Sequence, residues 1–295
     1  MFKGSNVALV TPFKNNNLDE ETYIKIINFH LENGTNGLVP AGTTGESPTL
    51  SHKEHEKVIE LCINESKGKI PVIAGTGSNS TSEAISLTKH AEKAGADGAL
   101  VVTPYYNKPT QEGLYQHYKS INDNCGIPII IYNIPGRSVI DMNIDTMTRL
   151  FELKNIVGVK DATGDLNRVE ESIKAMGKEF IQLTGEDGNA LEFNKKGGVG
   201  CISVTANIAP KLCSEMQKLS KSSSNNEIKE AEKIDKLLQP VHKSLFIESN
   251  PSPVKYAAKL IGLCNDEVRL PLVTIMESTK NQVKKSLISA NLIDE

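Results

Sequence analysis

With 295 residues, of which 38% are hydrophobic and 23% charged, the chain has an ordinary globular composition and the length of a large α/β barrel. Its net charge of −3 provides no basic field, so neither nucleic acid nor anionic lipid is expected as a partner. The longest apolar run, Ile127–Tyr132, is far shorter than the ~20 residues that span a bilayer, and we find no signal-peptide core. Five scattered cysteines without a C-x-x-C motif indicate reduced thiols, and we expect a cytoplasmic protein.

Short runs rich in β-branched residues alternate with longer amphipathic stretches along most of the chain. The predicted strands are Val7–Thr11, Gly37–Pro40, Val72–Gly75, Ala99–Thr103, Ile129–Asn133, Val157–Asp161, Ile181–Gly185 and Gly200–Val204. Helical periodicity lies between them, at Glu21–Asn33, Lys53–Ser66, Ser82–Ala94 and Gln111–Asn124. Several strands are continuous apolar runs, which is typical of a parallel sheet covered by helices. Eight such units favour an α/β fold of the (β/α)8 TIM-barrel type over an open sheet.

The polar stretch Ser220–Glu227 interrupts this alternation and is predicted to be a loop. Beyond it the periodicity is helical only, at Ile228–Lys243, Val254–Leu263 and Thr274–Ala290. We therefore predict a barrel over residues 1–224 and a C-terminal helical domain over residues 225–295.

The ends of the predicted strands carry the unusual residues. In barrel enzymes the chemistry lies at the C-terminal ends of the strands, so these segments are the candidates for a site. In chain order they are Gly42–Glu46, Gly75–Asn79, Thr103–Asn107, Tyr132–Arg137, Lys160–Asp161 and Gly185–Asp187. Together they place hydroxyl groups, one lysine and one arginine on one rim.

Lys160 ends the sixth predicted strand. Because side chains alternate between the faces of a strand, Val157 and Val159 are predicted to face the outer helices. Gly158 and Lys160 then point into the barrel, with Gly158 leaving room for a substrate. Burial of a lysine favours the neutral amine, which can attack a carbonyl. The alternative is a strand-end lysine paired with Asp161 at the surface, and the pattern alone favours neither.

Two glycine-rich segments also follow strands. Gly42–Glu46 is either an ordinary turn before a helix or a carboxylate cradle of backbone N–H groups and a helix N-terminus. It lacks the lysine of a P-loop. Gly75–Ser80 nearly matches a dinucleotide fingerprint, but Ser80 replaces the third glycine and no acidic residue ends the next strand, so we predict no NAD site. Glu186 and Asp187 argue against a phosphate site after the seventh strand, and carboxylate substrates fit better.

The tyrosines Tyr105, Tyr106 and Tyr132 lie at two adjacent strand ends, with Thr43 nearby. They are either ordinary core aromatics or a chain of hydroxyl groups that relays protons. Arg137 is either a solvated loop charge or a bidentate clamp for a carboxylate.

No metal site is predicted. His52 and His55 open a predicted helix, but their spacing fits neither of the zinc-binding patterns built from two histidines and a glutamate. The other histidines are isolated.

These motifs resemble the dihydrodipicolinate synthase branch of the class I aldolase superfamily, which includes N-acetylneuraminate lyase. The resemblance covers essentially the whole chain. The matching segments are Gly42–Ser47, Pro71–Gly77, Val102–Asn107, Gln111–His117, Tyr132–Arg137, Gly158–Gly164 and Asn250–Lys255.

The resemblance implies that Lys160 forms a Schiff base with pyruvate. It also implies that Tyr132, Thr43 and Tyr106 relay protons, with Tyr106 donated across a dimer interface by the neighbouring subunit. Arg137 then holds the carboxylate of the second substrate, L-aspartate 4-semialdehyde. The further substrate-binding positions implied are Thr44, in the pyruvate-carboxylate cradle, Gly185 and Ile202.

The implied product is 4-hydroxy-tetrahydrodipicolinate, on the route to diaminopimelate and lysine, made without a metal or organic cofactor. The implied assembly is a homotetramer, a dimer of dimers. L-Lysine is implied as an effector, at positions matching Ser47, His52, His55, Asn79, Glu83 and Tyr105. Pro48 in this stretch could alter the loop, and the alternative is that the two histidines merely begin a solvated helix.

Two rival interpretations remain open. One is a sister aldolase that cleaves sialic acid or 2-keto-3-deoxy sugars, and the other is a catalytically silent barrel that acts as a binding protein. Arg137 favours the synthase, because a neutral sugar chain offers no carboxylate at that point.

Overall fold

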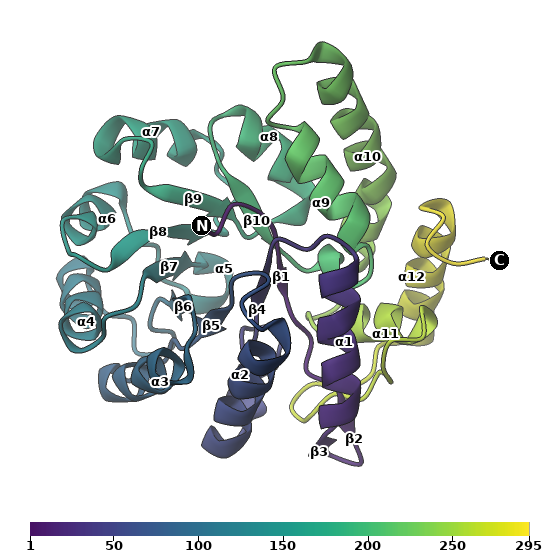
Figure 1. The fold of residues 1–295 in the computed structure, drawn as a ribbon, viewed down its shortest axis with the longest axis horizontal. Helices are drawn as coiled ribbons and strands as arrows, with labels where there is room; N and C mark the ends of the chain where they lie inside the picture. Colours follow the sequence, from purple (N-terminus) through teal and green to yellow (C-terminus); the bar gives the residue numbers. More distant parts are fainter. Residues whose placement is uncertain (295) are drawn as a thin grey trace.

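The computed structural model describes residues 1–294, which form an eight-stranded parallel barrel ringed by helices (Figure 1). The barrel strands are β1 (Gly4–Ala8), β4 (Gly37–Val39), β5 (Ile73–Gly75), β6 (Gly98–Val102), β7 (Ile129–Asn133), β8 (Ile156–Asp161), β9 (Ile181–Thr184) and β10 (Gly200–Ser203). Strand β1 pairs with both β4 and β10, and a bridge from Leu38 to Val72 closes the ring. A small antiparallel hairpin, β2 (Phe13–Lys14) and β3 (Asn17–Leu18), lies apart from it. The predicted barrel is confirmed.

Nine helices accompany the barrel strands in the described part of the chain. They are α1 (Glu20–Glu32), α2 (His52–Ser66), α3 (Thr81–Ala94), α4 (Gln111–Asn124), α5 (Pro135–Ser138), α6 (Ile144–Phe151), α7 (Asn167–Met176), α8 (Ala190–Lys195) and α9 (Pro210–Leu219). The starts of α1, α2 and α4 were predictable because a side chain caps each of them locally. Ser51 and Glu54 form a reciprocal capping box at α2, and the Thr110 hydroxyl accepts from the Gly113 N–H at α4.

The first strand begins three residues earlier than the prediction, because its start is polar. Asn6 lies inside the barrel, fully buried, and its amide donates to the backbone oxygens of Phe2 (3.2 Å) and Cys201 (3.4 Å). A buried amide that is hydrogen-bonded to backbone carbonyls is compatible with a strand interior, although its polarity hides the strand from a hydrophobic pattern.

Strand β8 contains an irregularity that the alternating pattern did not predict. Its pairing with β7 passes from Ile129–Ile156 directly to Ile130–Gly158, so that Val157 is an extra residue. Val157 consequently packs against the cluster inside the barrel, and the prediction that it faces the outer helices is wrong.

The rest of β8 follows the expected parity. Val159 belongs to the cluster between strands and outer helices, so Lys160 faces inward. The prediction that Gly158 leaves room for a substrate is wrong, because a Cβ there would lie 2.2 Å from the backbone oxygen of Ile181. Gly158 instead permits the close approach of strand β9.

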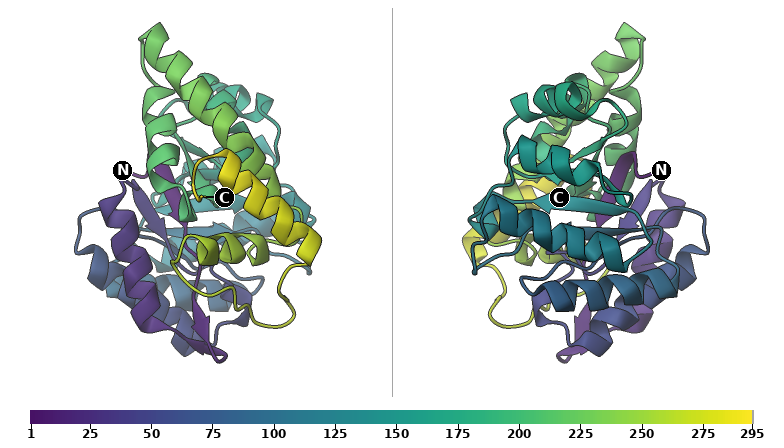
Figure 2. Two further views of the ribbon diagram at one scale, coloured as in Figure 1. Left: turned by 90° about the vertical axis from the view of Figure 1, so that its right-hand side faces the viewer. Right: turned by 90° about the vertical axis from the view of Figure 1, so that its left-hand side faces the viewer.

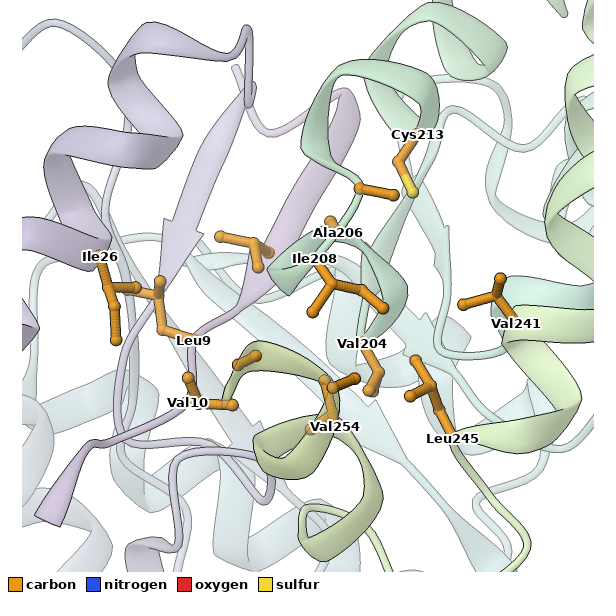
Figure 3. Close-up of a cluster of buried hydrophobic side chains, with 14 of the residues drawn as sticks. Leu9, Val10, Ile26, Val204, Ala206, Ile208, Cys213, Val241, Leu245 and Val254 are labelled. Carbon is orange, nitrogen blue, oxygen red and sulfur yellow. The ribbon is translucent and has the colours of Figure 1, made fainter. Parts of the chain in front are cut away.

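The C-terminal segment adds α10 (Asn225–Ser244), α11 (Ser252–Leu260) and α12 (Glu277–Ser289) along one side of the barrel (Figures 1 and 2). These helices share a hydrophobic core with the barrel, and Figure 3 shows Leu9, Val10 and Val204 near Val254 and Leu245. The predicted loop was three residues too long, since Asn225–Glu227 form the solvated first turn of α10. The boundary between residues 224 and 225 stays a prediction. Within residues 1–294, no helix combines the length and apolarity needed to cross a membrane.

Candidate active site

Lys160 lies inside the C-terminal end of the barrel and is 6% exposed. Its backbone pairs with Tyr132 on the neighbouring strand, and its Nζ lies 4.0 Å from the centroid of the Tyr132 ring. Within residues 1–294, no carboxylate lies within ion-pair distance of this nitrogen. The structure therefore buries an amine and leaves it without a charged partner.

Asp161 decides between the two interpretations of this lysine. Its carboxylate accepts from Arg168 Nε at 3.0 Å and from the Thr163 hydroxyl at 2.6 Å. A surface pair between Lys160 and Asp161 is thus excluded, because the carboxylate is already held by its own strand-to-helix loop.

Arg168 extends this contact into a brace between two strand ends. It donates to Asp141 (3.3 Å) and to the backbone oxygen of Met142 (2.7 Å), and Asp141 accepts from the Asn133 amide at 2.6 Å. Asn133 follows Tyr132, and Asp161 follows Lys160. Sequence reasoning missed this brace, although polar residues immediately after two candidate residues were a signal for it.

A cavity of about 470 Å³ opens at the same end of the barrel. Its wall includes three of the predicted catalytic and substrate-binding residues, Thr43, Tyr132 and Arg137. Lys160 does not line this cavity, but its nitrogen lies over the ring of Tyr132, which does. Gly185 lies directly beside the lysine side chain, because a Cβ at this position would lie 3.0 Å from Lys160 Cε. Ile202 is fully buried in the cluster inside the barrel, with no face on the cavity.

The loop Gly42–Glu46 is a tight turn fixed by backbone hydrogen bonds, including that from the Glu46 N–H to the Thr43 oxygen at 3.1 Å. Thr44 is 3% exposed, and its hydroxyl accepts from the Asn250 amide at 3.0 Å. The helix N-terminus expected directly after this loop is not there, because a short 3-10 turn intervenes and α2 begins only at His52. A cradle at this loop would consist of backbone N–H and hydroxyl groups alone.

Arg137 is exposed on α5, where its Nη2 donates to the backbone oxygen of Asn250 at 3.2 Å. It has no carboxylate partner among the described residues. Besides the first cavity it lines a second one, of about 620 Å³, formed mostly by C-terminal residues between Phe246 and Val273. The guanidinium therefore has N–H groups left to donate beside a cavity. This favours the interpretation as a carboxylate clamp over that as a solvated loop charge.

Tyr106 does not join this site within one chain. It is 89% exposed, has a φ of 73°, and does not line the cavity, whereas Tyr105 does. The chain brings Thr43 and Tyr132 together on one cavity wall and leaves the third predicted relay hydroxyl pointing away.

Most residues of the predicted effector set line the same cavity. These are Ser47, His52, His55, Glu83 and Tyr105; Asn79 lies outside the wall, but its amide donates to the Tyr105 backbone oxygen at 3.2 Å. Hydrogen bonds from Ser78 and from His52 (2.9 Å) lower the pKa of Glu83, so that it carries a charge at neutral pH. His52 begins a solvated helix, as the alternative holds, but His55 is buried, and burial lowers its pKa to about 4.

The two acidic residues after β9 have different surroundings. Asp187 is buried and accepts from the backbone N–H groups of Val204 (2.8 Å) and Thr205 (3.1 Å), which fixes the turn after β10. Burial, followed by the charge of Asp187, raises the pKa of Glu186, and nearby Lys160 offsets part of that shift. Glu186 is thus a carboxyl group near the Lys160 amine. No role in catalysis was predicted for Glu186 from the sequence.

Among residues 1–294, no group of three or more histidine, cysteine or acidic side chains is arranged to hold a metal ion.

The chain is similar to known proteins over nearly its whole length. Residues 1–290 match the model of the dihydrodipicolinate synthetase family. A relative from Pelagibacter ubique named 4-hydroxy-tetrahydrodipicolinate synthase is 76% identical over 293 residues, which cover 99% of this chain and 100% of the relative. A dihydrodipicolinate synthase from Acinetobacter baumannii, solved with pyruvate, superposes with a TM-score of 0.96 at 46% identity, over 99% of this chain and 100% of the other. The enzyme from Cyanidioschyzon merolae, solved with lysine, gives 0.95 at 36% identity, over 99% of both chains.

Proposed function

The chain belongs to the dihydrodipicolinate synthetase family, and from that premise we propose that it condenses pyruvate with L-aspartate 4-semialdehyde through an imine on Lys160. The observation that carries this proposal is a buried lysine that has no carboxylate partner within residues 1–294. It lies over Tyr132, which lines a cavity together with Thr43 and Arg137. The product is 4-hydroxy-tetrahydrodipicolinate. The rival sugar aldolase is not supported, since the relatives described above carry the synthase name.

The proposed steps use only this chain's side chains and the two substrates. The Lys160 amine adds to the ketone carbon of pyruvate, and loss of water gives a protonated imine. A proton leaves the methyl carbon, and the resulting enamine attacks the aldehyde carbon of the semialdehyde. The amine of the semialdehyde then adds to the former ketone carbon and expels the Lys160 amine. Tyr132, on which the lysine lies, carries protons in the dehydration.

The carboxylates of the two substrates are held by different groups in this proposal. Thr44 and the backbone of its loop bind the carboxylate of pyruvate, and Arg137 binds that of the semialdehyde. Gly185 keeps space for the lysine side chain, and Ile202 forms part of the apolar wall beneath the site. No step needs a metal or an organic cofactor.

Tyr106 completes the proton relay from a second subunit. Its exposure of 89% and its absence from this chain's own cavity support donation in trans. The working unit is then at least a dimer, and the assembly a homotetramer made of two dimers. Mixing inactive Tyr106→Phe subunits with inactive Lys160→Ala subunits restores activity if the relay is shared. A monomeric sedimentation profile without complementation would refute it.

L-Lysine acts as an effector in this cavity. The charged Glu83 binds its ammonium group, and Tyr105 and Asn79 bind its carboxylate end. The lysine bound to the Cyanidioschyzon merolae enzyme supports this assignment. Because Tyr105 adjoins Tyr106, inhibition need not compete with pyruvate; a coupling of about 1–3 kcal/mol gives partial inhibition. If millimolar lysine leaves the wild-type rate unchanged, or if it inhibits Glu83→Ala as strongly as the wild type, this regulatory site is absent.

We assign residues 1–224 to the catalytic barrel and residues 225–295 to a C-terminal helical domain. A cytoplasmic location is consistent with five free thiols in the described chain and with the reaction of a biosynthetic family. The function itself is tested by a coupled assay that compares pyruvate plus aspartate semialdehyde with N-acetylneuraminate. Turnover of the sugar acid alone would overturn it.

A further inference from the structure

Asn250 connects the C-terminal segment to both carboxylate-binding groups. It lies between α10 and α11, is 5% exposed, and lines the second cavity together with Arg137. Its side-chain Nδ2 donates to the Thr44 hydroxyl at 3.0 Å, and its backbone oxygen accepts from Arg137 Nη2 at 3.2 Å. Asn250, more than 200 positions from Thr44 in sequence, thus contacts both Thr44 and Arg137.

The direction of the first bond determines what the Thr44 hydroxyl can do. A hydroxyl has one proton to donate and two lone pairs that accept. Since Asn250 supplies a proton to the oxygen, the proton of Thr44 itself stays free, and no acceptor takes it within residues 1–294. A buried hydroxyl with a free proton is a donor for an anionic oxygen.

The amide oxygen of Asn250 supports the same view. It is buried and has no hydrogen-bond partner among the described residues. An unsatisfied buried acceptor destabilises the fold, so stability alone does not explain an asparagine at this position. An aspartate would occupy the same volume but could only accept, and would then consume the proton of Thr44.

We propose that Asn250 is a positioning residue that sets Thr44 as a donor to the carboxylate of the keto acid and, through its backbone oxygen, orients Arg137 toward the second carboxylate. This inference rests on the proposed function. It makes the C-terminal segment part of the substrate site. The two contacts use different atoms of the residue, so they can be separated by substitution.

Asn250→Ala removes the amide but keeps the backbone oxygen. The half-saturating pyruvate concentration for borohydride trapping, and the KM for pyruvate, should rise about 3–10-fold, the value of one neutral hydrogen bond. The KM for the semialdehyde should stay within about twofold, because the Arg137 contact is retained. Asn250→Asp, which is isosteric, should raise the KM for pyruvate by more than tenfold, since it adds charge repulsion between carboxylates.

Two controls distinguish positioning from general support. Ser244→Ala removes another buried hydrogen bond of the C-terminal helices, that with Ser286 (2.7 Å), and should leave both KM values unchanged. Thr44→Val and Asn250→Ala should be strongly non-additive in a double-mutant cycle on pyruvate affinity.

The outcomes are separable. If the wild type traps pyruvate but Asn250→Ala and Asn250→Asp keep its affinity, this inference fails while the proposed function stands. Equal rises in both KM values, together with a Tm loss matched by Ser244→Ala, overturn it in favour of a structural role. If the wild type traps no pyruvate, the proposed function fails first and the inference with it.

Discussion

Lys160 and Lys255 are both buried, and the side-chain nitrogen of each lies over an aromatic ring, at 4.0 Å from the Tyr132 centroid and 4.3 Å from that of Phe13. Their surroundings differ, because Lys255 has a carboxylate partner, whereas no carboxylate of residues 1–294 lies within ion-pair distance of the Lys160 nitrogen. Lys255 Nζ donates to Glu46 at 2.7 Å and to a backbone oxygen at 2.8 Å.

The comparison shows that burial alone does not identify a reactive lysine. Burial lowers the pKa of Lys255, and the neighbouring Glu46 offsets part of that change, so the pair is a fully satisfied structural contact. It fixes the Gly42–Glu46 loop, which carries Thr43, to α11. Lys160 lies over Tyr132, whose ring lines the cavity, and no carboxylate of residues 1–294 is within ion-pair distance of its amine.

The largest expected effect separates activity from stability at Lys160. Lys160→Met should lower the condensation rate by at least ~10³-fold, because the covalent nucleophile is gone. Thermal stability should be equal or higher, since no ion pair is broken and an apolar side chain enters the barrel. Coupled kinetics and a melting curve check this. A variant that unfolds would show that Lys160 is structural after all.

Lys255→Met should give the opposite result. Removing the lysine leaves the carboxylate of Glu46 buried without its cation, at a cost of about 3–5 kcal/mol in the free energy of unfolding. Adding Glu46→Gln should recover much of this loss, because an amide still accepts from the Arg269 N–H at 3.0 Å. Denaturant titration measures both. Equal stability of the single and double variants would contradict the assignment of a paired, structural lysine.

How far the sequence predicts these two regions depends on how local the information is. The inward direction of Lys160 follows from strand parity, and three helix starts follow from side-chain caps. The bulge at Val157 does not, because it depends on register with the neighbouring strand.

The sequence pattern also could not predict contacts between residues that lie far apart in the chain. Glu46 looked like part of a cradle, yet it turns inward to Lys255. Asn250 fell within a matching motif, but nothing local shows that it reaches Thr44 and Arg137. Tyr106 is 89% exposed and does not line the cavity, which no local pattern showed.

Arg137 is a third cation to compare with these two lysines. It is exposed and has no carboxylate partner within residues 1–294. Arg137→Ala should raise the KM for the semialdehyde about 30-fold, corresponding to about 2 kcal/mol, the low end for an unpaired carboxylate, because the site is solvated. Imine trapping with pyruvate should be unchanged. Arg149→Ala, which removes a surface pair with Glu112, is the matched control and should alter neither. An unchanged semialdehyde KM in Arg137→Ala would argue against the clamp.

The smallest expected effect is a loss of folding stability at low pH. It involves the residues around Lys255 and not those around Lys160. Arg269, whose N–H also binds Glu46, forms two hydrogen bonds to Glu54 and lowers the pKa of that carboxyl to about 2. The unfolded value is 4.5, so this stabilisation is present above pH 4.5 and is lost as the pH falls from 4.5 to 2. With partial exposure considered, about 1–2 kcal/mol is at stake. Wild type and Glu54→Gln should therefore converge in stability near pH 2, and a constant difference between them would contradict this.

The most direct measurement is to map where pyruvate becomes attached. The protein is incubated with pyruvate and borohydride, digested, and analysed by peptide mass spectrometry, alongside Lys160→Met and Lys255→Met. We expect a single reduced pyruvyl group per chain, on the peptide that carries Lys160, with none on Lys255 and none anywhere in Lys160→Met. An adduct on Lys255, or labelling that persists in Lys160→Met, would contradict the claim that the unpaired buried lysine is the reactive one.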